Sequence, residues 1–98
     1  MAATTAAAEI EREIQRASKR EIQQLTTRLQ RLRNLLNDVT ACISHERKQR
    51  KKAMKRDHPS DVVRSNQHLR VLQRQYATAS LQRHRLSYRM SALRQQTQ

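Results

Sequence analysis

The sequence predicts an all-α protein: an antiparallel helical hairpin or coiled coil that other chains complete. The 98 residues include no glycine and one proline, and alanine, leucine, arginine and glutamine are abundant, as in long helices. Two runs of apolar residues repeat at alternating spacings of three and four, which is the heptad pattern of packed helices. The proline lies between the two runs. With two tyrosines as the only aromatic residues, a compact globular core is not expected.

The first predicted helix covers residues 6–57, after a flexible stretch of residues 1–5. Thr5 is expected as its N-cap, and the three glutamates that follow it suit the positive end of the helix dipole. The apolar residues of this helix form a seam, a line of side chains expected to face another helix. The seam contains Ile22, Leu25, Leu29, Leu32, Leu36, Val39 and Ile43.

The second predicted helix covers residues 61–95, after a turn at residues 58–60 and before a flexible stretch at 96–98. Pro59 supports the turn, because proline disfavours helix in the preceding residue and fits the first turn of a helix. The second apolar run has the same spacing with two polar interruptions. Its members are Val62, Ser65, Leu69, Leu72, Tyr76, Ala79, Arg83, Leu86, Met90 and Leu93. The interface is expected at Leu69, Leu72, Tyr76, Leu86, Met90 and Leu93.

The two seams match each other in an antiparallel arrangement. Facing residues in such a pair have numbers with a constant sum, and a sum of 115 brings apolar residues together along most of the seam, for example Ile43 with Leu72. The midpoint of this register falls between residues 57 and 58, where the proline independently predicts a break. A hairpin within one chain is therefore expected.

Further apolar residues lie outside the seams and indicate additional chains in the assembly. A helical hairpin of this size is marginally stable alone, because ordering its backbone costs about 1 to 2 kcal/mol per residue. A second stripe on the later helix and two residues beside the first seam offer more apolar surface. They are Ala77, Leu81, Tyr88, Ala92, Leu35 and Cys42. Other coiled-coil chains, identical or different, are the expected partners.

A basic segment precedes the turn and is the predicted binding site for an anionic partner. The chain has 21 lysines and arginines against 8 acids, a net charge of +13, so attraction to anionic surfaces is expected. Seven of these cations occur within ten residues: Arg47, Lys48, Arg50, Lys51, Lys52, Lys55 and Arg56. The hairpin places them at its weakly packed tip, where acidic protein or nucleic-acid phosphates are the expected ligands.

No catalytic residue, metal site or cofactor site is predicted, and the chain is not expected to be an enzyme. Cys42 and His45 form one pair at metal-ligand spacing, but a zinc site needs four converging ligands. The lone cysteine excludes an internal disulfide, and no apolar run reaches the roughly 20 residues of a membrane span. A cytoplasmic or nuclear location is expected.

The predicted function is a structural subunit of a larger coiled-coil assembly that docks onto an acidic protein or polymer, such as a microtubule. The alternative is a sequence-independent nucleic-acid-binding protein that its coiled coil dimerises. A nuclear import adaptor segment is a third reading of the basic run. A leucine-zipper transcription factor is disfavoured, since its helix must continue where Pro59 interrupts this one.

Overall fold

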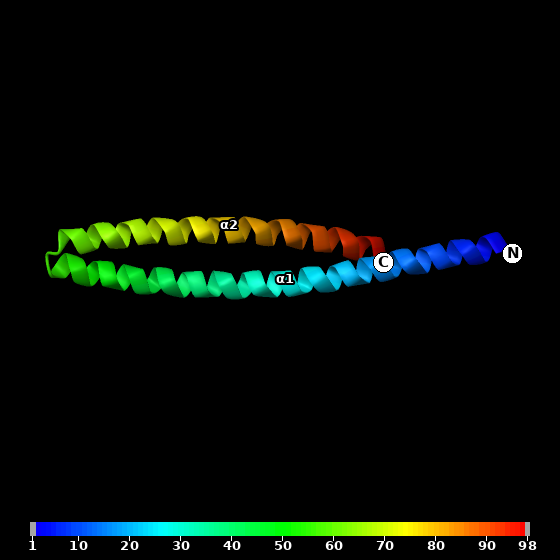
Figure 1. Ribbon diagram of the computed structural model, residues 1–98, viewed down its shortest axis with the longest axis horizontal. Helices are drawn as coiled ribbons and strands as arrows, with labels where there is room; N and C mark the ends of the chain where they lie inside the picture. Colours follow the sequence, from blue (N-terminus) through cyan, green and yellow to red (C-terminus); the bar gives the residue numbers. More distant parts are fainter. Residues whose placement is uncertain (1, 98) are drawn as a thin grey trace.

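The protein is an all-α helical hairpin, as the sequence predicts. A computed structural model describes the backbone of residues 2–97 and the side chains of residues 5–96. Helix α1 (Ala2–Lys55) and helix α2 (Pro59–Thr97) lie side by side in opposite directions, joined by a tight turn (Figure 1). The Cα atoms extend over 83 × 16 × 14 Å, so the molecule is a thin rod.

The turn begins where α1 ends at a residue with left-handed backbone geometry. Asp57 has a φ of 55°, and its N–H donates to the carbonyl of Met54 at 3.3 Å. The N–H of His58 reaches back to the carbonyl of Ala53 at 3.1 Å. These two hydrogen bonds form a Schellman motif, in which a left-handed residue ends a helix and satisfies its last carbonyl groups.

Helix α2 starts directly after this motif, earlier than the predicted residue 61. The carbonyl of His58 accepts the hydrogen bond of Val62 N–H at 3.2 Å, which makes Pro59 the first helical residue. Proline is favourable there, because its fixed φ is helical and its missing N–H has no helical partner at that position. The turn therefore occupies residues 56–58 instead of 58–60.

Helix α1 starts at Ala2, so the predicted N-cap role of Thr5 is wrong. Thr5 lies inside the helix, and the first turn contains no acidic residue, since Glu9, Glu11 and Glu13 follow later. The alanine-rich start of the chain has high helix propensity, which extends the helix through the stretch predicted as flexible. Residues 96 and 97 are also helical. Met1 and Gln98, which complete the two predicted flexible ends, lie outside the described residues.

Burial follows the heptad spacing on both helices. All seven predicted seam residues of α1 are buried or half-buried, and the pattern continues to Glu46, Arg50 and Ala53. On α2, five of the six predicted interface residues are buried or half-buried. Tyr76 is the exception at 42% exposed, because two helices alone do not enclose a side chain of its size. Ser65 and Ala79 are buried on the same line.

Contacts between the helices agree with the predicted register. The Thr26 hydroxyl oxygen lies 3.6 Å from the sulfur of Met90, and these residue numbers add to 116. Glu46 and His68 contact at 3.0 Å, and their numbers add to 114. Both values lie within one residue of 115, so α2 faces α1 only from about residue 18 onward.

The first part of α1 therefore extends beyond the hairpin. Figure 1 shows this segment, coloured blue, projecting past the C-terminal end of α2. We call residues 2–17 the overhang. Its two isoleucines, Ile10 and Ile14, are each 60% exposed, because no helix of the described chain lies beside them.

Candidate anionic-partner interface

The basic segment forms one end of the rod. It occupies the last turns of α1 and the first residue of the turn, at the closed end of the hairpin (Figure 1). Six of its seven predicted members are exposed, and we call these six the basic tip. They are Arg47, Lys48, Lys51, Lys52, Lys55 and Arg56. Six exposed cations on one small surface create a strong positive potential there.

Arg50, the seventh predicted member, does not belong to this exposed cluster. It lies on the seam three residues before Ala53 and is half-buried. Its Nε atom is buried and has no hydrogen-bond partner among the residues that the structure describes. The heptad position turns this arginine toward α2, so its side chain packs partly between the helices near the tip.

A polar layer replaces apolar packing on the seam next to the tip. Glu46 contacts His68 at 3.0 Å between Oε2 and Nδ1, and the hydroxyl of buried Ser65 donates to the same carboxylate. The Ser65 hydrogen bond is the main cause that lowers the pKa of Glu46, and His68 lowers it further against the opposing effect of burial. The charged carboxylate is thus stabilised between the helices.

The fold adds a cation from α2 to the tip. Arg64 lines a shallow hollow of ≈ 280 Å³ together with Lys52 of α1 and Arg56 of the turn. Asp61 lines the same hollow, and Asp57 is exposed in the turn beside it. The tip therefore presents mostly cations with two carboxylates at its extreme end. The sequence prediction missed Arg64 because only the register of the two helices brings it beside Arg56.

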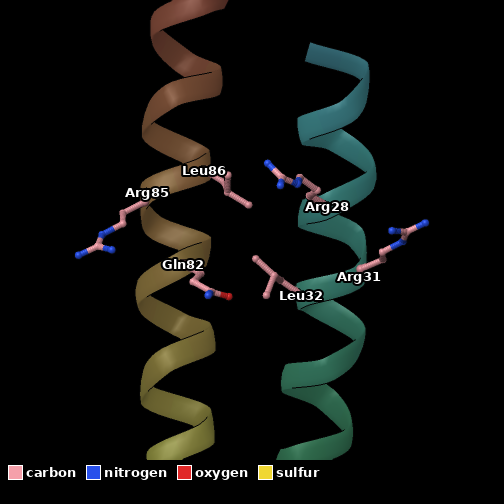
Figure 2. Close-up of a pocket in the computed structure, with 6 residues that line it drawn as sticks. All are labelled: Arg28, Arg31, Leu32, Gln82, Arg85 and Leu86. Carbon is pink, nitrogen blue, oxygen red and sulfur yellow. The ribbon is translucent and has the colours of Figure 1, made fainter. Parts of the chain in front are cut away.

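A second cationic region lies in the middle of the rod. Figure 2 shows a groove of ≈ 400 Å³ in which Leu32 and Leu86 approach each other between the helices. Arg31 and Arg85 point outward from the two sides, while Arg28 extends toward the opposite helix. The groove thus combines an apolar floor with a rim of three guanidinium groups. The sequence prediction did not include these arginines, which are spread over both helices.

The described residues contain no group of three or more histidine, cysteine or acidic side chains placed to hold a metal ion. Cys42 is exposed and unbonded. Neither helix, as far as it is described, contains a stretch that is both long and apolar enough to cross a bilayer. The features that remain are the basic tip, the polar layer, the arginine-rimmed groove and the overhang.

Comparisons of the chain with protein-family models, with characterised proteins and with solved structures find no match. The function is therefore argued from the geometry and charge of these four features.

Proposed function

We propose that the protein is a non-enzymatic coiled-coil scaffold subunit that docks through its basic tip onto an acidic protein surface or polymer, such as a microtubule. The observation that carries this proposal is the placement of the six exposed cations at one end of an 83 Å rod. A rod with one charged end can act as a spacer: its charged end binds an anionic surface, and a partner bound at its other end is held at a fixed distance from that surface. The cytoplasm and the nucleus both contain such surfaces.

The tip favours an acidic protein over nucleic acid as its ligand. Its extreme end carries the exposed carboxylates of Asp57 and Asp61 beside the cations. A phosphate backbone is uniformly negative, so these carboxylates reduce its attraction to the tip. A protein surface that alternates acidic and basic groups complements both charges, and such complementarity provides specificity.

The first prediction concerns the four lysines of the tip. Replacing Lys48, Lys51, Lys52 and Lys55 by glutamine keeps good helix-forming residues but removes four exposed charges. Affinity for the acidic partner is expected to fall at least tenfold at moderate ionic strength, with helicity unchanged by circular dichroism. Co-sedimentation with polymerised tubulin measures the affinity.

A matched control removes the same number of charges from the other end of the rod. Arg12, Arg16, Lys19 and Arg20 are exposed, and their glutamine variant has the same net charge as the tip variant. We expect this control to retain most of the binding. Equal losses in both variants would contradict docking through the tip, since only total charge would then matter.

Competition with duplex DNA separates the two classes of partner. Tubulin binding that persists in excess duplex at moderate salt supports a protein partner. Complete displacement by DNA supports the nucleic-acid alternative. In that case the logarithm of the affinity for DNA falls with the logarithm of the salt concentration, with a slope of about 0.9 for each neutralised phosphate. Loss of four cations in the tip variant reduces the total slope by up to about 3.6.

A further inference from the structure

We propose that the overhang of one copy binds a groove on a second copy, and that the second copy's overhang binds the first in return. The result is a closed dimer with two-fold symmetry. Neither contact uses the basic tip or an anionic partner, so this inference goes beyond the proposed function and does not depend on it.

The overhang is an acidic amphipathic helix. At 3.6 residues per turn, Ile10 and Ile14 lie within about 40° of each other, and Glu11 and Glu13 lie about 80° to either side of this apolar stripe. The overhang's two cations, at positions 12 and 16, lie on the opposite face. Its three acids and two cations give a net charge of −1, although the whole chain carries +13. Both isoleucines are 60% exposed and have no partner within the described hairpin.

The groove has the complementary character. Leu35 and Val71, each 48% exposed, line a hollow of ≈ 530 Å³ between α1 and α2. This hollow also contains Arg74, and it shares Gln82 with the groove of Figure 2. The two hollows therefore adjoin each other on one side of the hairpin, and together we call them the groove; its lining includes apolar side chains and Arg28, Arg31, Arg74 and Arg85. An apolar helix with glutamates on both sides of its stripe suits such a groove.

The overhang stripe and the groove lie on the same face of α1. A series of α1 positions with alternating spacings of four and three stays on one face of the hairpin. Its members are positions 10, 14, 17, 21, 24, 28, 31 and 35. Ile10 and Ile14 begin this series, and Arg28, Arg31 and Leu35 end it. The salt bridge from Glu21 to Arg89 at 3.0 Å places this face on the side where α1 and α2 meet.

This arrangement permits both contacts at once. When two copies of α1 run antiparallel about a two-fold axis near residues 22 and 23, residue 10 of each copy lies opposite residue 35 of the other. Each overhang then lies in the groove of the other copy, so the apolar stripe at Ile10 and Ile14 is covered in both copies. Charge selects this pairing over a parallel one, because the overhang carries a net charge of −1, whereas the remainder of the chain carries +14 and repels itself.

Sedimentation equilibrium of the full chain at about 100 µM tests the proposal, with twice the monomer mass of 11.6 kDa expected. The variant Ile10→Gln/Ile14→Gln should be monomeric and equally helical, because the overhang is not part of the hairpin packing. The matched control Arg12→Gln/Arg16→Gln changes the opposite face and should remain dimeric. A monomeric wild type, or a dimer that survives loss of both isoleucines, would overturn the proposal.

Charge reversal tests the pairing of overhang with groove. The variant Glu11→Arg/Glu13→Arg and the variant Arg31→Glu/Arg85→Glu each place like charges together and should be monomeric. An equimolar mixture of the two variants restores opposite charges at both contacts, so it should form a heterodimer of the wild-type mass. A mixture that stays monomeric, or two variants that dimerise separately, would show that the overhang does not occupy this groove.

Discussion

Asp57 holds the backbone geometry on which the turn depends. A chain without glycine has no residue that adopts a left-handed conformation freely, and among the other residues aspartate and asparagine tolerate it best. Asp57 is the one non-glycine residue with positive φ in the described part of the chain. The Schellman hydrogen bonds of the turn offset its strain.

The variant Asp57→Gly is therefore expected to stabilise the hairpin. Glycine removes the steric cost of the left-handed conformation, but it also loses more conformational entropy on folding. The first effect is larger, so the free energy of unfolding should rise by about 0.5 to 1 kcal/mol. Asp57→Val should instead destabilise it, because a β-branched residue is strained at this φ. Urea unfolding followed by circular dichroism measures both. A loss of stability in the glycine variant would contradict the observed turn.

At the scale of the helices, the seam consists of apolar layers that give way to polar ones near the tip. The layers around Leu25, Leu36 and Leu72 are buried and apolar. Toward the turn, Glu46 and its partners take their place, and their hydrogen bonds substitute for apolar burial. The stability of this end of the hairpin therefore depends on the charge state of one carboxylate.

The polar layer is expected to weaken in acid. The pKa of Glu46 is lowered in the folded chain, first by the Ser65 hydrogen bond and then by His68. A carboxylate whose pKa is lowered by folding stabilises the folded chain fully at pH values above its pKa in the unfolded chain, about 4.3. This stabilisation is lost as the pH falls through the pKa of the group in the folded chain. The midpoint temperature of unfolding should therefore fall from about pH 5.5 to pH 3.

The variant Ser65→Ala isolates the main cause of this effect. It removes the largest contribution to the lowered pKa of Glu46, so the variant should be less stable than wild type at pH 5.5. Its midpoint temperature of unfolding should also drop less between pH 5.5 and pH 3. Asn37→Ala, at an exposed position far from this layer, serves as the control and should keep the wild-type drop. An equal drop in all three proteins would contradict a role for the layer.

Periodicity predicts which face of each helix is buried, but not how deeply a side chain is enclosed. This is why the leucine positions of the seam were predictable, whereas the exposure of Tyr76 and the partial burial of Arg50 were not. Tyr76 has the correct spacing, yet its ring remains partly in water beside a single partner helix. Arg50 has a charge that suggested exposure, yet its heptad position turns it toward α2. Thr5 has a capping side chain, but the alanines around it carry the helix past it.

At the scale of the whole molecule, the register joins residues that the sequence separates. It brings Arg64 to the tip and places Arg85 across from Arg28 and Arg31, so the cationic regions are larger than the single run visible in the sequence. The basic run itself was predictable from composition. The groove and the overhang were not, because each exists only as the result of how far α2 reaches along α1.

Crosslinking within one chain tests the hairpin most directly, since the tip, the polar layer and the groove all require it. Arg33 and Ser87 line the same hollow from opposite helices, on the side away from the proposed dimer contact. In a Cys42→Ser background, the pair Arg33→Cys/Ser87→Cys should react with a short bismaleimide to give an intrachain product at low micromolar concentration. The control pair Arg33→Cys/Gln67→Cys, separated along the rod by about 22 Å at 1.5 Å per residue, should not. Exclusively interchain products from the first pair at this dilution would contradict the hairpin and indicate long helices paired between chains.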